Sequence, residues 1–374
     1  LNCISHRRPI PLNDIEFYDR QSSRCKSGAH LWHDDVHSGR HHDLHYMRIP
    51  WQKAGSDYQK AETLMELITR RQALELFESP LDELLSAADN LRRRFSKDHF
   101  DLCTIINAKS GSCSENCRFC SQSSHYMTFS ETYPLLSETE IIADAMRNES
   151  QGVRRYSLVT SGRRLSAQEL DRVCGIYENL KRETGLYLCS SHGLLEYDDF
   201  VRLRESGVSR YHNNLETGRE FFPQICTTHS YDDKLRAIRE AMRAGLEVCS
   251  GGIIGLGETI EDRIDMAMDL RELGIKSVPV NILNPIKGTP FESNRPLDEE
   301  EILRTIAVFR FILPDADIRL AGGRSLLSDR GERAFRSGAN AAITGDMLTT
   351  AGLGTKSDIE LVKSLGYTVC QNNM

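Results

Sequence analysis

From about residue 59, the chain alternates short runs typical of β-strands with longer stretches whose apolar positions recur at helical spacing. Two helices are predicted first, near residues 59–75 and 79–96. In the second, apolar side chains recur every three or four positions, at Leu81, Leu84, Leu85, Ala88 and Leu91. This repeat predicts one apolar face that packs against the rest of the fold.

Eight strands are predicted after these helices. They are Leu102–Asn107, Arg155–Thr160, Tyr187–Ser191, Val208–Asn213, Glu247–Gly251, Ser277–Leu283, Asp317–Ala321 and Ala341–Thr344. The intervening stretches are long enough for crossover helices, as in Thr139–Asn148, Ala167–Glu183, Asp232–Ala244, Ile260–Leu273 and Glu299–Phe311. This alternation favours an α/β fold, a (β/α)8 TIM-type barrel with an N-terminal helical extension. An open doubly wound sheet is the structural alternative.

Residues 1–58 show no sustained period of 3.6 or 2, and they hold seven of the twelve histidines. Their spacing does not recur and no cysteine pair accompanies them, so a flexible or artefactual extension is favoured over a metal site. Met47 and Met65 are candidate true starts. Residues 59–374 are therefore predicted to form the barrel domain.

The chain of 374 residues is long enough for a large barrel, and its formal charge of −7 gives no overall positive field for nucleic acid or anionic lipid. No apolar run approaches the roughly 18 residues that span a bilayer. We therefore expect a cytoplasmic protein that acts on a small molecule. Eleven cysteines in such a chain favour metal binding over a disulfide framework.

Three cysteines are concentrated in the run Cys113-Ser-Glu-Asn-Cys117-Arg-Phe-Cys120, shortly after the first predicted strand. Three thiolates can hold three irons of a cubane cluster and leave the fourth iron open to a ligand. A four-cysteine cluster or a zinc site would normally need a fourth ligand nearby, and none follows at a suitable spacing.

This C-x3-C-x2-C spacing resembles the signature of the radical S-adenosylmethionine (SAM) superfamily. The resemblance implies a [4Fe-4S] cluster whose open iron is chelated by SAM, which is then cleaved reductively to a 5′-deoxyadenosyl radical. It also implies that Phe119 packs beside the adenine, although ordinary core packing is compatible with the same position.

Longer motifs over most of residues 60–367 resemble the biotin synthase family. They are Asn107-Ala-Lys-Ser-Gly-Ser-Cys113, Cys120-Ser-Gln-Ser-Ser124, Tyr211-His-Asn-Asn-Leu-Glu-Thr217, Cys249-Ser-Gly-Gly-Ile-Ile-Gly-Leu-Gly-Glu258, Val278-Pro-Val-Asn281, Lys287-Gly-Thr-Pro290 and Ile318-Arg-Leu-Ala-Gly-Gly-Arg324. Together they are much more specific than the cysteine run.

The resemblance implies SAM contacts by Glu216, Lys234 and the segment with Gly255 and Gly257. The family usually has Asp and often Arg at the first two positions. Taken alone, the glycines fit a tight turn equally well.

For the substrate dethiobiotin, the resemblance implies contacts from Asn214 and Asn281, the second of them to the ureido ring. It further implies that Thr349 and Thr350 hold the carboxylate tail.

A second, auxiliary iron-sulfur cluster is implied as the sulfur donor. The better-known form holds a [2Fe-2S] centre through three cysteines and an arginine, and this chain keeps counterparts at Cys189, Cys249 and Arg319 but has Ser157 at the remaining position. We hypothesise that Cys189, Cys226 and Cys249 hold a rearranged cluster of the four-iron type. Buried free cysteines are the alternative. Cys103, Cys174, Cys3 and Cys25 are interpreted as structural or incidental, with Cys370 a less favoured fourth ligand.

The predicted function is therefore sulfur insertion that converts dethiobiotin to biotin. A flavodoxin- or ferredoxin-type electron donor and a homodimer are expected by resemblance. The alternatives are a relative of the hydrogenase-maturation or methylornithine synthase type, and a non-catalytic iron-sulfur or zinc protein.

Overall fold

The computed structural model describes residues 67–350 and 352–369. The predicted extension (residues 1–58), much of the first predicted helix and Cys370 lie outside these ranges. Two helices, α1 (Arg70–Phe77) and α2 (Leu81–Ser96), precede the first strand, and α2 confirms the second predicted helix to within two residues of its start. Arg304 on a later helix donates hydrogen bonds to the carbonyls of Phe77 and Ser79 and so ties the connection between α1 and α2 to the barrel.

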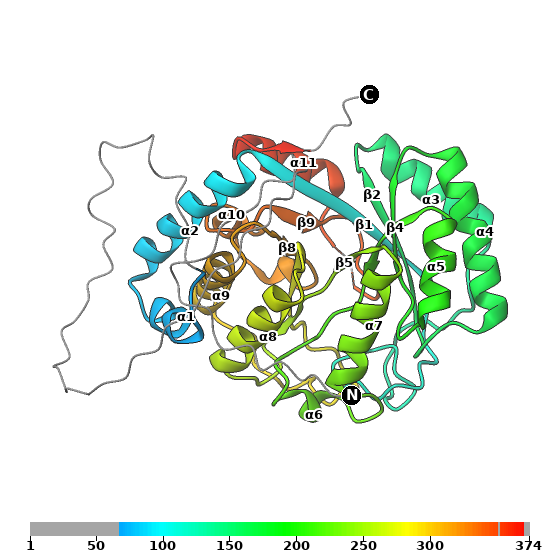
Figure 1. Ribbon diagram of the computed structural model, residues 1–374, viewed down its shortest axis with the longest axis horizontal. Helices are drawn as coiled ribbons and strands as arrows, with labels where there is room; N and C mark the ends of the chain where they lie inside the picture. The colour runs from blue at the N-terminus through cyan, green and yellow to red at the C-terminus, as the bar shows by residue number, and fades with distance from the viewer. Residues whose placement is uncertain (1–66, 351, 370–374) are drawn as a thin grey trace, which may run out of the picture. The chain divides into compact units, whose positions relative to one another are not determined.

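The strands form one parallel sheet that closes on itself (Figure 1). They are β1 (His99–Lys109), β2 (Arg155–Thr160), β3 (Tyr187–Ser191), β4 (Val208–His212), β5 (Glu247–Cys249), β6 (Gly252–Ile254), β7 (Ser277–Ile282), β8 (Asp317–Leu320), β9 (Ala341–Ile343) and β10 (Thr368–Val369). Pairing of β1 with β9 closes the barrel, while β5 and β6 act as one strand interrupted at Ser250 and Gly251. The predicted (β/α)8 barrel is confirmed, and an open doubly wound sheet is excluded.

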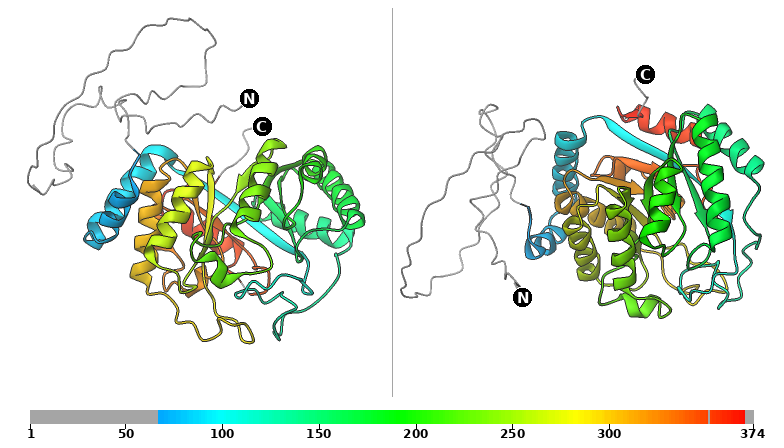
Figure 2. Two further views of the ribbon diagram at one scale, coloured as in Figure 1. Left: turned by 60° about the horizontal axis from the view of Figure 1, so that its bottom comes forward. Right: turned by 45° about the vertical axis from the view of Figure 1, so that its right-hand side comes forward.

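Helices cover the outside of the strands (Figures 1 and 2). After α1 and α2 they are α3 (Glu138–Ser150), α4 (Ala167–Glu183), α5 (Tyr197–Glu205), α6 (Phe222–Ile225), α7 (Tyr231–Arg243), α8 (Ile260–Glu272), α9 (Glu299–Ile312), α10 (Glu332–Phe335) and α11 (Thr355–Ser364). Capping boxes begin α3, α4, α7 and α8, each pairing Ser or Thr with an acid three residues later. These boxes satisfy backbone N–H groups at the helix start and fix where each crossover helix leaves its loop. Among the described residues, no helix has the length and apolar character to cross a membrane.

Alternation along each strand separates the two faces of the barrel. On β2, Tyr156 and Leu158 are fully buried in the core between strands and helices. Arg155, Ser157 and Val159 point the other way and line the interior. Because side chains of a strand alternate between faces, this register points Arg155 and Ser157 into the barrel and packs Tyr156 and Leu158 against the helices.

A buried ion pair fastens α11 to the barrel. Asp358 accepts hydrogen bonds from Arg324, which follows β8, and from the Thr344 hydroxyl at the end of β9 (2.6 Å). The side chains of Arg324 and Asp358 are 2% and 1% exposed. The segment between Thr344 and α11 carries Thr349 and Thr350, so this pair also anchors part of the interior lining.

Replacing Asp358 with Asn is expected to lower the free energy of unfolding by about 3 kcal/mol, because Arg324 would remain buried without its counter-charge. Urea unfolding of the apo-protein measures this. The control is Asp315→Asn, which breaks an exposed pair with Lys276 and should cost under about 1 kcal/mol. Equal losses in the two variants would contradict a special role for the buried pair.

Candidate active site

The barrel interior holds a cavity of about 410 Å³. One part of its lining is rich in thiols and arginines: Cys103, Arg155, Cys189, Arg210, Cys249 and Arg319. Another part combines the cysteine loop that follows β1 with polar residues from later strands and loops, including Asn214, Glu216, Asn281, Thr349 and Thr350. Residues from widely separated sequence motifs therefore line one cavity.

The loop after β1 brings together Cys113, Cys117 and Cys120. The Cys113 amide bonds the Gln122 carbonyl (3.1 Å), and the Cys120 amide bonds the Cys117 carbonyl (3.0 Å), so the loop turns back on itself. Burial raises the pKa of Cys120 to about 11, and the nearby Cys113 and Glu216 add to that shift. Cys117 and Cys120 line the cavity, as does Phe119 between them. Three convergent thiols from one loop fit a cubane cluster with one open iron.

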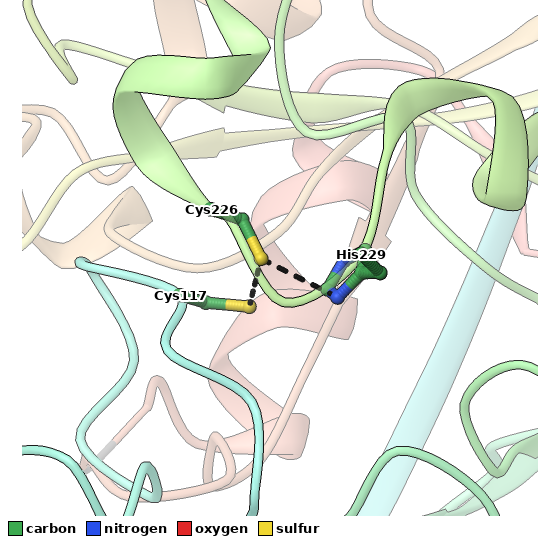
Figure 3. Close-up of side chains that lie close together, drawn as sticks. All are labelled: Cys117, Cys226 and His229. Carbon is green, nitrogen blue, oxygen red and sulfur yellow. Dashed lines mark hydrogen bonds between the residues drawn. The ribbon is translucent and has the colours of Figure 1, made fainter.

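Two further side chains, Cys226 and His229, lie close to Cys117 (Figure 3). Cys226 lies just after α6 with its Sγ 3.8 Å from the Sγ of Cys117 and 3.3 Å from Nδ1 of His229. His229 Nδ1 also lies 2.5 Å from a Glu115 carboxylate oxygen. Hydrogen bonds with Cys117, His229 and Thr228 lower the pKa of Cys226 despite burial. The sequence pattern does not point to Glu115 and His229 as site residues. The two are more than one hundred residues apart, and only the fold brings them together.

The structure does not assemble the predicted trio of Cys189, Cys226 and Cys249. Cys226 contacts Cys117, and it is absent from the cavity lining that holds the other two thiols. The physical reason is the path of the chain beyond β4: it first forms α6, whose Ile225 carbonyl accepts from the Arg118 amide in the cysteine loop (2.9 Å). Cys226 therefore lies beside Cys117 of the cysteine loop.

Asn214 and Glu216 follow β4 and lie beside each other at the cavity. The Asn214 amide donates to Glu216 (3.3 Å) and accepts from the Gly251 backbone (3.1 Å). Glu216 has a φ of 74°, an unusual conformation for a residue with a side chain. Its backbone bonds both sides of the β5–β6 interruption, through Gly251 and Ile253, and these bonds hold the conformation.

Asn281 and the threonine pair approach the cavity from β7 and from the loop after β9. Asn281 donates to the Gly252 carbonyl (3.1 Å) and accepts from the Gly322 amide (2.9 Å), so its side-chain amide is fixed by backbone groups on both sides. Thr349 accepts a hydrogen bond from Ser121, just beyond Cys120 (3.0 Å). This contact joins the predicted substrate tail site to the cysteine loop.

The glycines and the lysine predicted to contact SAM lie outside the cavity lining. Gly255 and Gly257 have φ values of 94° and 105° and make the turn after β6, where Glu258 accepts from the Gly255 amide (2.8 Å). Gly251 permits a close approach of two backbone segments, because a Cβ there would lie 1.9 Å from the Pro279 carbonyl oxygen. Lys234 donates to Asn213 (3.1 Å) and lies near enough to Cys117 and His212, which line the cavity, to oppose the raised pKa of Cys117 and to help lower the pKa of His212.

Neighbouring strands place the predicted auxiliary ligands side by side. Ser157 on β2 pairs in register with Cys189 on β3, Cys189 pairs with Arg210 on β4, and Cys249 on β5 pairs with His212. Ser157 thus lies beside Cys189, at the position where the family resemblance implies a cysteine that this chain lacks. Burial lowers the pKa of His212 to about 4, so its ring is neutral at pH 7.

A third thiol, which the sequence analysis set aside as structural, reaches this group. Cys103 on β1 is level with Arg155 on β2, one inward-facing position nearer the start of the strands than Ser157. Burial raises its pKa to about 11, Arg319 opposes the shift, and Asp101, Cys189 and Cys249 add to it. The sequence signal was available: Cys103 and Ile105 alternate toward the cavity as Arg155 and Ser157 do.

An acid and three arginines surround these thiols. Asp101 accepts from Arg319 (2.7 Å), Arg155 (3.3 Å) and Arg210 (3.4 Å). Burial alone would raise the pKa of Asp101, but Arg319, Arg155 and Arg210 hold it well below its usual range. Glu247 also pairs with Arg210 (2.9 Å), so two carboxylates face three cations. The remaining positive charge suits the pocket to additional negative charge, such as thiolates and sulfide.

Two family profiles match the chain. The Radical SAM superfamily profile covers residues 109–270, and the Biotin and Thiamin Synthesis associated domain covers residues 279–368. Among solved structures, methylornithine synthase superposes with a TM-score of 0.73 at 21% identity, covering 82% of this chain and 95% of that one. The FeFe-hydrogenase maturase from Carboxydothermus hydrogenoformans superposes with a TM-score of 0.71 at 16% identity, covering 82% of this chain and 77% of that one. These likenesses show the fold, and with the cysteine loop they define the class as a radical SAM barrel protein.

Curated relatives narrow this class. Biotin synthase of Clostridium botulinum (strain Hall) is 54% identical over 312 residues, 83% of this chain and 98% of that protein. Biotin synthase of Akkermansia muciniphila is 54% identical over 301 residues, 80% of this chain and 94% of that protein. The chain belongs to the biotin synthase family.

Proposed function

We propose that the protein converts dethiobiotin to biotin by radical SAM sulfur insertion. The observation that carries this proposal is the coincidence, around one cavity, of a three-cysteine loop and a second group of three buried thiols with arginines. A protein that only stored or transferred electrons would not need two amides and two threonines facing the same space.

The cysteine loop holds the first cofactor. Cys113, Cys117 and Cys120 bind a [4Fe-4S] cluster, which together with SAM supplies a 5′-deoxyadenosyl radical when bound. Phe119 packs at the adenine, and Glu216, fixed by Asn214, offers its carboxylate to the ribose hydroxyls. The barrel walls exclude water from the reacting carbons, which protects a reactive radical.

The substrate lies between the two thiol groups. Asn214 and Asn281 each keep one amide hydrogen and one carbonyl lone pair beyond the hydrogen bonds described above, and these complement the acceptor and donors of a cyclic urea. Thr349 and Thr350 accommodate the carboxylate tail. These contacts orient the two carbons that receive sulfur toward the second group of thiols, which consists of Cys103, Cys189 and Cys249.

The second group of thiols holds the auxiliary cluster. Cys103, Cys189 and Cys249 are its protein ligands, and Arg155, Arg210 and Arg319 offset its negative charge. A four-iron cluster with one iron open to a displaceable sulfide fits three thiolates better than the [2Fe-2S] form, since Ser157 removes the thiol that the latter uses.

Replacing Thr350 with Val is expected to raise the KM for dethiobiotin about tenfold and leave kcat nearly unchanged, because a hydrogen bond to a charged group is lost while the reacting carbons keep their place. Steady-state kinetics under anaerobic conditions measures the effect. Thr368→Val, on β10 at the opposite end of β1, is the control and should leave KM unchanged. A fall in kcat without a change in KM would contradict a tail-binding role.

The function itself is tested with reconstituted, reduced protein, SAM and dethiobiotin, following 5′-deoxyadenosine and biotin by mass spectrometry. Both products are expected. Formation of 5′-deoxyadenosine without biotin, in protein with both clusters intact, would leave the radical SAM class standing and overturn the substrate.

A further inference from the structure

We infer that Cys117, Cys226 and His229 form a binding site for a single thiophilic divalent cation, occupied only while the [4Fe-4S] cluster is absent. The three ligand atoms lie within 4.8 Å of one another, and the residues come from the cysteine loop and the segment after α6 (Figure 3). This site goes beyond the proposed function, but its competition with the cluster rests on Cys117 being a cluster ligand.

The spacing of the ligand atoms matches a tetrahedral zinc site. With Zn–S bonds of about 2.3 Å and Zn–N bonds of about 2.0 Å, two sulfurs at tetrahedral corners lie about 3.8 Å apart, and a sulfur and a nitrogen about 3.5 Å apart. The Sγ atoms of Cys117 and Cys226 are 3.8 Å apart, and Cys226 Sγ lies 3.3 Å from His229 Nδ1. Both separations therefore fit neighbouring corners of a tetrahedral site.

The surroundings favour a cation at this point. Two thiolates balance a divalent charge. Glu115 holds His229 Nδ1 at 2.5 Å, so a cation that binds this nitrogen replaces its proton and breaks that hydrogen bond, which leaves the Glu115 carboxylate as a negative charge beside the ion. Arg163 and Thr228 hold that carboxylate in place at 3.3 Å and 2.8 Å. His229 is buried against the ring of Phe222, and its described polar contacts are all made by Nδ1, the nitrogen that faces Cys226.

Sharing of Cys117 makes the cation and the cluster alternatives. Cys117 cannot ligate a cluster iron and a separate ion in these positions, so a bound cation removes one of the three thiolates that the cluster needs. Zinc is consequently expected to hinder cluster assembly through Cys226 and His229, two residues that are not cluster ligands.

Zinc chloride is the probe in the direct test. Crystals of the full-length apo-protein, soaked anaerobically, should show an anomalous peak at the zinc edge bonded to Cys117, Cys226 and His229. Zinc found only among Cys113, Cys117 and Cys120, zinc found only at Cys103, Cys189 and Cys249, or no bound zinc would each overturn the inference. This arm needs no variant, so it holds even if a substitution disturbs folding.

The competition is tested by cluster reconstitution. One equivalent of zinc added beforehand should slow [4Fe-4S] formation in the wild type about tenfold or more, and Cys226→Ser or His229→Gln should remove most of that effect. Cys174→Ser, a buried thiol on α4, is the matched control and should behave as the wild type. Unhindered assembly in zinc-loaded wild type would overturn the inference, whereas failure of untreated wild type to build a cluster on Cys113, Cys117 and Cys120 would overturn the proposed function instead.

Discussion

Replacing Cys103 with serine is expected to abolish biotin formation while 5′-deoxyadenosine formation from SAM continues. Cys103 faces the cavity from β1 and is close enough to Cys189 and Cys249 for those thiols to raise its pKa. Without it, only two thiolates remain for the auxiliary cluster, and a cluster with two protein ligands would not be retained. The cysteine loop, where we propose that SAM binds, is on a different part of the lining and should be unaffected.

Iron and sulfide analysis of the reconstituted variant measures this loss, together with both products by mass spectrometry. Cys174→Ser removes an equally buried thiol from α4 and serves as the control, with both clusters expected to be retained. An unchanged second cluster in Cys103→Ser would show that Cys103 is a packing residue and return the ligand question to Cys189, Cys249 and Arg319 alone.

Replacing Cys117 with alanine is expected to abolish both products. The cysteine loop supplies only three thiolates, and the loss of one leaves too few ligands for a stable cubane. No cluster then positions SAM for reductive cleavage, so neither radical formation nor sulfur insertion follows. Electron paramagnetic resonance of the dithionite-reduced protein tests the first step directly.

The outcome at the auxiliary site separates this variant from a misfolded protein. The thiols Cys103, Cys189 and Cys249 lie on strands away from the loop, so iron bound there should remain in Cys117→Ala. Appreciable 5′-deoxyadenosine formation by this variant would contradict the assignment of the loop as the SAM cluster site.

Most of the fold could be predicted from the sequence. Apolar runs bounded by polar loops predicted all eight barrel strands, because an interior strand must alternate or be wholly apolar to fit between helices and cavity. The interruption between β5 and β6 was not foreseen. It depends on Gly251 and Gly252 approaching the Pro279 and Glu216 backbones, which is a tertiary contact with no local signature.

The candidate site residues were also only partly predictable from the sequence. The proximity of Cys113, Cys117 and Cys120 was predictable because one short loop carries all three, and the position of Cys189 and Cys249 at the cavity because they lie on predicted strands. Cys226 was wrongly grouped with the latter pair, since the turn through α6 that brings it to Cys117 is fixed by a contact with Arg118. The alternation of side chains along the first strand already placed Cys103 on the cavity-facing side. Its position beside Arg155 follows only from the pairing register of β1 and β2, so it was interpreted as structural.

The source of the inserted sulfur tests the account most directly. Protein whose clusters are rebuilt with sulfide of a heavy sulfur isotope, then freed of excess sulfide, should convert dethiobiotin to biotin that carries the heavy isotope in its first turnover. Mass spectrometry of the product measures this. Biotin lacking the isotope, or no biotin from protein that holds both clusters and cleaves SAM, would contradict sulfur donation from a cluster on Cys103, Cys189 and Cys249.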